Sequence, residues 1–257
     1  MSNERDLAFI ASALSLKPED TVLEIGPGTG TLTKRLLARA CRVVAVEKDA
    51  DMVSHLRQNF WEPNLEVIPG DILQFGIQDA LKPGAPVKVV GNIPYNITSP
   101  IIEWLIASRK IVSEAVLTVQ WEVARRLAAQ PGGRDWGSLS VFLQFYADVR
   151  FLKKIDKSHF HPAPKVDSGV LRIIFLNKPR FPLTRETHFF GLVRRAFQKC
   201  RKTLLNALAD KEDMEPSKKG LLAAFSACRI DPKRRPETLT LREWADLSES
   251  LGSPGQK

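Results

Sequence analysis

The sequence contains few cysteines and no long hydrophobic run. Each of these two features excludes a class of protein. Its three cysteines, Cys41, Cys200 and Cys228, are odd in number and far apart, so they indicate neither a disulfide framework nor a zinc site. No apolar run approaches the ~20 residues of a membrane-spanning helix, and the polar start Met1–Asp6 is unlike a signal peptide. We therefore expect a cytoplasmic protein without a membrane-spanning segment.

The charge of the chain is unevenly distributed. The 257 residues are 44% hydrophobic and 26% charged, which suits a protein with one large domain and one small one. The net charge is +9, yet residues 1–149 hold 15 Lys and Arg against 17 Asp and Glu, whereas residues 150–257 hold 23 against 12. Basic charge concentrated in one half indicates a polyanionic partner, because neutralised phosphates release counterions. A basic surface that is merely solvated is the alternative.

A strand, a glycine-rich loop and a helix follow one another early in the chain. Thr21–Ile25 is predicted to be a strand, and Gly26–Gly30 leads into a helix that ends at about Ala40. Glycines let backbone amides approach a ligand, and a helix N-terminus favours anions, so this order is typical of nucleotide binding. Glu24 would repel a pyrophosphate but can anchor an ammonium group, which favours S-adenosylmethionine over NAD. The cofactor-binding residues predicted here are Glu24, Gly26 and Gly28.

Two further strands bring polar residues to the same edge of the predicted sheet. The strand Arg42–Val46 ends in Glu47, and an acidic residue at this position binds ribose hydroxyls in such sheets. The strand Leu65–Ile68 is followed by Asp71, which can accept a hydrogen bond from an adenine amino group or simply form a turn. The predicted cofactor-binding set is completed by Lys48, Ile72 and Asn92.

A polar turn follows the buried strand Val87–Val90. Asn92 is predicted to lie at the carboxyl end of this strand, where parallel sheets form a ligand-binding crevice. Its amide oxygen can accept a hydrogen bond from an exocyclic amino group. Pro94 makes the turn rigid, and Tyr95 supplies a flat aromatic face beside the acceptor. These groups together suit a base that has swung out of its stack, although a simple turn with a half-buried tyrosine is the plainer interpretation.

A second aromatic residue is predicted to face the same base. Phe160 lies in the irregular, proline-containing stretch 160–168, where it can form a wall opposite Tyr95 or serve only core packing. The predicted catalytic residues are Asn92, Pro94, Tyr95 and Phe160. His159 and His161 are two neighbouring histidines without a recognised set of carboxylate or cysteine ligands, so no metal site is expected.

The remaining pattern predicts a second, helical domain. Helices are expected over 6–16, 49–60, 99–108, 120–129 and 139–146, and strands over 115–119, 149–152 and 170–175. After residue 178 only helices are expected, over 184–198, 201–209, 217–228 and 240–251, the last beginning with the capping box Thr240–Glu243. Residues 252–257 look disordered. The predicted RNA-binding residues of this basic part are Arg194, Arg195, Lys199, Arg201, Lys202, Lys233, Arg234 and Arg235.

In these motifs the chain resembles the ribosomal RNA adenine dimethyltransferases of the KsgA type. The likeness runs from about residue 2 to residue 247, and each motif is weak alone but the ordered series is specific. The motifs that carry it are Glu24–Gly30, Glu47, Asp71-Ile72, Asn92–Tyr95, Gln120–Leu127, Gly137–Val141, Phe160–Ser168, Phe197–Leu204 and Arg235–Leu239.

The resemblance implies an α/β fold, with a Rossmann-like class I methyltransferase domain over 1–178 and a small all-α C-terminal domain over 179–257. It implies S-adenosylmethionine as cofactor and dimethylation of the N6 amines of two adjacent adenosines near the 3′ end of small-subunit (16S) rRNA. The implied partner is this rRNA within an immature 30S particle, and the implied state is a monomer. By resemblance, Gly26, Glu47, Asp71 and Asn92 bind the cofactor, while Asn92, Tyr95 and Phe160 handle the target base.

One departure and three alternatives accompany the resemblance. The family has a basic lead-in and a Gly-Gln-Asn-Phe-Leu-like segment ahead of the position of Met1, which closes over the methyl donor. Since residues 1–257 lack it, we expect them to bind the cofactor weakly and to methylate slowly or not at all.

The alternatives are a large-subunit rRNA dimethyltransferase of the antibiotic-resistance type, a DNA adenine methyltransferase, and a non-catalytic ribosome-assembly or transcription factor. The basic tail and Arg235–Leu239 favour the small-subunit enzyme, and Ile93 argues against the DNA enzyme.

Overall fold

The computed structural model describes residues 3–40, 42–80, 86–209 and 217–252. The chain forms two compact units, of which the first comprises residues up to Ala128 together with Tyr146–Asn177. The second comprises Ala129–Phe145 and the residues from Lys178 onward. Residues 253–257 of the expected disordered tail lie outside the described residues, and Gly252 is the last residue of a helix.

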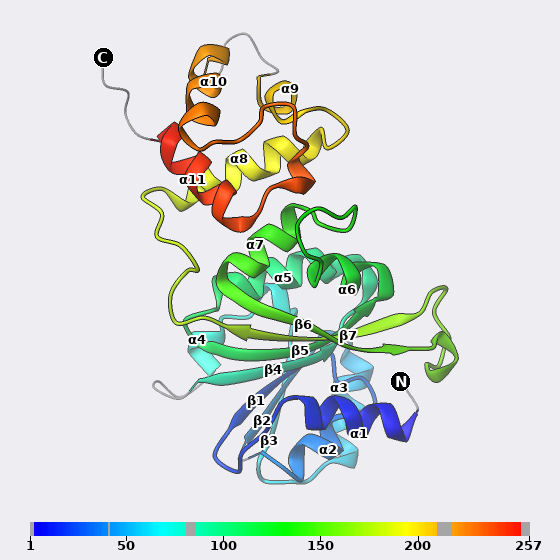
Figure 1. The fold of residues 1–257 in the computed structure, drawn as a ribbon. Helices are drawn as coiled ribbons and strands as arrows, with labels where there is room; N and C mark the ends of the chain where they lie inside the picture. Colours follow the sequence, from blue (N-terminus) through cyan, green and yellow to red (C-terminus); the bar gives the residue numbers. More distant parts are fainter. Residues whose placement is uncertain (1–2, 41, 81–85, 210–216, 253–257) are drawn as a thin grey trace. The chain divides into compact units, whose positions relative to one another are not determined.

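A seven-stranded mixed sheet forms the centre of the first unit (Figure 1). The strand order is β3-β2-β1-β4-β5-β7-β6, with β1 to β5 parallel and β7 antiparallel to both its neighbours. β1, β2, β4 and β5 are buried almost throughout, as expected for parallel strands covered on both faces. The bounds are β1 Thr21–Ile25, β2 Arg42–Glu47, β3 Leu65–Pro69, β4 Val87–Asn92, β5 Val112–Gln120, β6 Ala147–Ile155 and β7 Ser168–Phe175.

Six helices of the described residues belong to this unit. Asn3 and Asp49 cap two of them, each accepting hydrogen bonds from two backbone N–H groups of the first turn. The first helix therefore begins two residues earlier than the predicted 6–16, and it ends before Ser15, whose φ of 45° leaves the helical region. The helices are α1 Glu4–Ala13, α2 Thr33–Leu37, α3 Ala50–Asn59, α4 Ile77–Ala80, α5 Thr98–Ala107 and α6 Trp121–Leu127.

The strand order reverses beside β1, and this places two polar loops together. β1 pairs with β2 on one side and with β4 on the other, so the loops that follow β1 and β4 leave the same edge of the sheet. Ligands bind in the crevice at such a reversal in open α/β sheets. Gly91 permits the close approach of the two strand ends, because a Cβ there would lie 2.8 Å from Ile93 Cδ1 and 3.0 Å from Ile25 Cβ.

The second unit is helical. Trp244, Phe189 and Phe225 are fully buried in it. Phe142 of α7 meets Phe190 edge-to-face at a centroid distance of 4.7 Å, and Phe145 packs against Phe189 at 4.8 Å. These ring contacts explain why residues 129–145, which the sequence analysis places in the first domain, group with the second unit. Its helices are α7 Ser138–Tyr146, whose last residue belongs to the first unit, α8 Glu186–Gln198, α9 Leu204–Leu208, α10 Lys218–Ala227 and α11 Leu241–Gly252.

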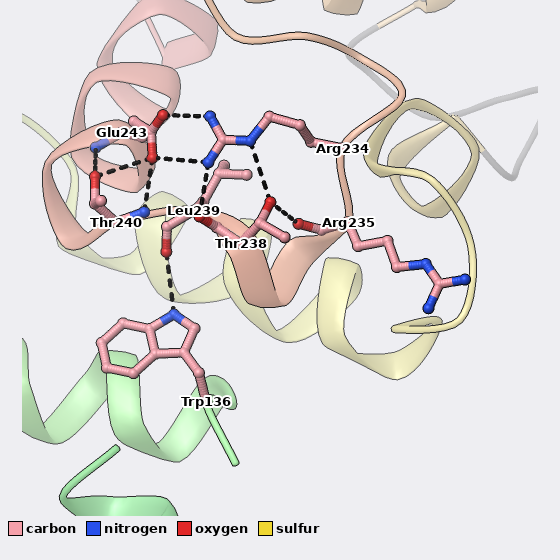
Figure 2. Close-up of polar contacts among 7 residues, drawn as sticks. All are labelled: Trp136, Arg234, Arg235, Thr238, Leu239, Thr240 and Glu243. Carbon is pink, nitrogen blue, oxygen red and sulfur yellow. Dashed lines mark hydrogen bonds and ion pairs between the residues drawn. The ribbon is translucent and has the colours of Figure 1, made fainter. Parts of the chain in front are cut away.

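A polar network stabilises the start of α11 (Figure 2). Thr240 N donates to Glu243 Oε2 over 2.7 Å and Glu243 N donates to Thr240 Oγ1 over 3.2 Å, which confirms the predicted capping box. Trp136 Nε1 donates to the carbonyl oxygen of Leu239 over 3.1 Å, and so ties the segment before α7 to the same network. In the part of the chain that the structure describes, no helix is long and apolar enough to cross a membrane.

Candidate active site

The glycine loop after β1 adopts a conformation that only glycine tolerates well. Gly26, Gly28 and Gly30 have φ values of 61°, 57° and 79°. A Cβ built on Gly26 or Gly28 would meet nothing within 4 Å, so there is open space against the backbone at both positions. A Cβ on Gly30 would lie 2.5 Å from the ring of Phe60, which gives the third glycine a packing role. The loop therefore fits a ligand laid against its first two glycines.

Glu47 holds this loop from the end of β2. Its Oε2 accepts a hydrogen bond from Gly28 N at 3.0 Å, while Oε1 accepts from Lys48 N at 2.8 Å and Asp49 N at 2.9 Å. The residue is only 8% exposed, yet a carboxylate offers about four acceptor positions and three are used here. One position thus stays open for a hydroxyl group. The ribose contact predicted for Glu47 remains a prediction.

Asp71 follows β3 and forms a turn. Its Oδ1 accepts from Leu73 N at 3.0 Å, which caps the short 3-10 helix Ile72–Gln74, and its Oδ2 lies 2.9 Å from Lys48 Nζ. The hydrogen bond from Lys48, followed by that from Leu73, lowers the pKa of Asp71 below its usual value. The turn interpretation therefore holds, and the adenine contact stays a prediction. Ile72 is buried, whereas the Lys48 side chain is 77% exposed.

Glu24 lies beneath the loop rather than at its surface. It is 2% exposed, and its Oε2 accepts from Thr33 Oγ1 at the start of α2 over 2.6 Å. Burial raises the pKa of Glu24 to about 7, the Thr33 hydrogen bond opposes this shift, and the negative charge of Glu47 adds to it. The carboxyl group that is predicted to contact an ammonium group is therefore nearly inaccessible to solvent. The contact remains a prediction.

The raised pKa of Glu24 makes the stability of the protein depend on pH. Its folded pKa of about 7 exceeds the ordinary carboxyl pKa of 4.5, so between these values the folded state binds the proton more tightly and loses stability as pH rises. We expect urea unfolding to show wild type losing a few kcal/mol relative to Glu24→Gln between roughly pH 5 and pH 8. The comparison cancels the other titrating groups, and a constant difference between the two proteins across this range would contradict the assignment.

The loop after β4 and the connection between β6 and β7 enclose a pocket of about 240 Å³. It brings together all four residues predicted to act on the base, although they lie up to 68 positions apart in the sequence. Asn92 is exposed at its rim, and within the described residues its side-chain amide makes no hydrogen bond. Ile93 N donates to Thr118 O over 2.9 Å and fixes the turn to β5. The lining residues are Asn92, Ile93, Pro94, Tyr95, Phe160, Pro162 and Pro164.

Phe160 takes part in core packing and also lines the pocket, while its role as a wall for the base remains a prediction. It is half-buried, contacts the apolar cluster beneath the sheet and also lines the pocket. The neighbouring His159 Nδ1 lies 2.6 Å from Asp6 Oδ2, and Lys153 Nζ lies 2.6 Å from Asp6 Oδ1. Sequence reasoning missed this anchor, because Asp6 reads as an ordinary first-turn residue of α1. Only the place of His159 directly before Phe160 could have drawn attention to it.

Six of the eight predicted RNA-binding residues are exposed. Arg195 and Arg234 are partly buried and make hydrogen bonds within the helical unit. Arg195 Nη2 donates to Leu208 O. Arg234 donates to both oxygens of Glu243 and to Thr238 (Figure 2). The guanidinium groups of these two residues are engaged within the helical unit, and their contact with RNA remains a prediction. The exposed residues are Arg194, Lys199, Arg201, Lys202, Lys233 and Arg235.

Known proteins match this chain over almost its whole length. The family model described as "Ribosomal RNA adenine dimethylase" matches residues 1–252. The chain belongs to this family. It is 43% identical over 254 residues to Ribosomal RNA small subunit methyltransferase A of Geobacter metallireducens, covering 98% of this chain and 92% of the relative. The protein of the same name from Myxococcus xanthus is 42% identical, with 98% and 88% covered.

Two solved structures of similar proteins support the same assignment. A dimethyladenosine transferase from Plasmodium falciparum superposes with a TM-score of 0.81 and 29% identity, covering 96% of this chain and 95% of the other. The 23S rRNA methyltransferase ErmE superposes with a TM-score of 0.75 and 28% identity, covering 98% of each chain. The predicted family, the Rossmann-like class I methyltransferase fold with a helical C-terminal part, and the enzyme class of an rRNA adenine dimethyltransferase are confirmed.

Proposed function

We propose that this family member dimethylates the N6 amines of two adjacent adenosines near the 3′ end of 16S rRNA during 30S subunit assembly, using S-adenosylmethionine. The pocket that brings Asn92, Tyr95 and Phe160 together beside the glycine loop carries the proposal. Curated relatives at 42–43% identity, named as small-subunit methyltransferases, support the choice of rRNA.

The site can bind the cofactor and the base side by side. S-adenosylmethionine supplies an electrophilic methyl group on a sulfonium. We assign the ribose of the cofactor to the open acceptor position of Glu47 and its adenine to Asp71 and Ile72. The side of the cofactor that lies against the protein backbone is assigned to Gly26 and Gly28. These residues all follow the ends of β1, β2 and β3, at one edge of the sheet.

The target adenine is placed by the residues after β4. Its amino lone pair is delocalised into the ring and is a poor nucleophile, so the enzyme must position it. The amide oxygen of Asn92, free of other hydrogen bonds in the described chain, accepts from the amine and directs its lone pair at the methyl carbon, while Tyr95 and Phe160 hold the ring. Such positioning contributes several kcal/mol without a strong general base.

We assign the docking of the ribosomal particle to the exposed basic residues of the helical unit. Leu204 N donates to Arg234 O over 2.7 Å and Leu205 N donates to Pro232 O over 3.2 Å, so the residues that directly follow the basic segment 199–202 lie beside 232–234. This contact joins two basic segments that are about 30 positions apart into one surface. Its members are Lys199, Arg201, Lys202, Lys233 and Arg235.

The salt dependence of binding tests this surface. Charge reversal at Lys199, Arg201 and Lys202 is expected to lower the slope of log affinity against log salt by about one for each lost phosphate contact. Binding of the variant to immature 30S particles is measured at several salt concentrations. The matched control reverses Lys218 and Lys219, which are exposed in α10 outside the basic surface, and it retains the wild-type slope. Equal slopes for all three proteins would place the RNA elsewhere.

Methylation with labelled cofactor tests the proposed function as a whole. Immature 30S particles, naked 16S rRNA and naked 23S rRNA are incubated with the protein, and the modified nucleotides are mapped. We expect two adjacent dimethylated adenosines in the 30S particles, collected over long incubations because slow transfer is expected of residues 1–257. Label in 23S rRNA alone would favour a large-subunit enzyme, the second candidate, which the likeness to ErmE supports at lower identity. Binding to the particles without any label would favour a non-catalytic assembly factor.

A further inference from the structure

Strand β7 holds the hydroxyl group of Tyr95. The Tyr95 oxygen lies 3.0 Å from Ser168 Oγ and 3.4 Å from the carbonyl oxygen of Val166. A phenol has one proton to donate, so when both contacts form, Tyr95 donates to Val166 and accepts from Ser168. The aromatic wall of the base pocket is therefore fixed at its far end.

Ser168 makes no other side-chain hydrogen bond within the described parts of the chain. It is the first residue of β7, it is 0% exposed, and it pairs with Gln120 of β5 on one side and Ile155 of β6 on the other. A buried hydroxyl without a partner is costly, and Tyr95 is the partner that satisfies this one. The bond thus joins a rigid interior position to a residue at the rim.

The Ser168–Tyr95 bond also links two walls of the pocket that come from different connections. Tyr95 belongs to the turn after β4, whereas Phe160, Pro162 and Pro164 belong to the connection between β6 and β7. Ser168 is the residue at which that second connection enters the sheet. Beside it, a Cβ on Gly169 would lie 2.5 Å from Ala124 Cβ, so the backbone at this point packs closely against α6.

We propose that Ser168 is a positioning residue for methyl transfer, because its hydrogen bond fixes the hydroxyl end of the Tyr95 side chain and so keeps the ring axis from tilting against the target adenine. This inference rests on the proposed function. The plane of the Tyr95 ring sets the plane of a stacked base, and the base plane sets the direction of its amine relative to Asn92. Loss of the bond leaves the ring in the pocket but lets it tilt. The rate of transfer is therefore affected more than the binding of RNA or cofactor.

A double-mutant cycle tests the proposal. Single-turnover methylation rate, KM for 30S particles and cofactor affinity are measured for wild type, Ser168→Ala, Tyr95→Phe and the double variant. We expect each single variant to lower the rate about three- to tenfold with little change in the other two quantities. The double variant is expected to be no slower than the slower single variant, since both changes remove the same bond.

A matched control separates positioning from stability. Ser248 is 1% exposed and its Oγ lies 3.1 Å from His188 Nδ1, so Ser248→Ala also removes a buried serine hydroxyl with one partner. Its folding stability is expected to fall while its methylation rate stays at the wild-type value. If Ser168→Ala fails to fold, Tyr95→Phe alone tests the bond.

Two results would overturn the role of Ser168 while leaving the proposed function intact. One is a wild-type rate in Ser168→Ala or Tyr95→Phe, and the other is a double variant slowed by the product of the two single effects. A wild-type protein that methylates no adenosine would instead overturn the proposed function, and this inference with it.

Discussion

Asn92→Ala is expected to lower the rate of methyl transfer by about 100-fold or more, the largest effect of any single substitution in the pocket. Asn92 is the last residue of β4, and within the described residues no hydrogen bond to its amide oxygen is made, so this oxygen is open to the amine. Without it the amine loses its fixed direction toward the methyl group. Single-turnover kinetics with labelled cofactor measure the rate directly.

Two further variants show whether the acceptor oxygen is what matters. Asn92→Asp keeps an acceptor and is expected to retain more activity than Asn92→Ala. Asn96→Ala removes an exposed asparagine four positions later, in the 3-10 helix Tyr95–Ile97, and is expected to leave the rate unchanged. An Asn92→Ala protein with near wild-type kinetics would remove Asn92 from the mechanism.

Glu47→Ala is expected to weaken cofactor binding by about 5- to 150-fold, which corresponds to ~1–3 kcal/mol. Two effects combine in this loss. The ribose hydroxyls lose a charged acceptor, and the N–H groups of Gly28, Lys48 and Asp49 lose the carboxylate that orders the loop. Titration calorimetry with S-adenosylmethionine measures the affinity.

The control for Glu47 is an exposed glutamate in the same unit. Glu62→Ala removes one negative charge from the segment before β3 and is expected to bind the cofactor like wild type. Circular dichroism and thermal unfolding establish that both variants are folded. A folded Glu47→Ala protein with undiminished affinity would show that the ribose binds elsewhere.

Local patterns in the sequence were sufficient to predict most elements and the order in which polar residues leave the sheet. The apolar runs of β1, β2, β4 and β5 match strands buried on both faces, and the glycines after β1 match a loop with positive φ. These features depend on neighbours within a few residues, as does the capping box of α11. Such short-range sterics and hydrogen bonding can be inferred without knowing the path of the chain.

Partners that are far apart in the sequence could not be inferred in this way. His159 meets Asp6 across 153 positions, and Tyr95 meets Ser168 across 73. Each pair depends on which strands become neighbours, and that is decided by the crossover order of the whole sheet. The contacts of Arg195 with Leu208 and of Arg234 with Glu243 were missed for a related reason, since they are a property of the folded unit.

The sequence by itself determined the family, the sheet with its glycine loop and the residue types of the site, because these follow from motifs that local geometry requires. Only the tertiary structure decided that residues 129–145 join the helical unit, where the rings of α7 and α8 pack together. It likewise decided which basic side chains are exposed and which residues hold the pocket walls. Those outcomes depend on contacts between side chains that are far apart in the sequence. Only the folded chain brings those side chains together.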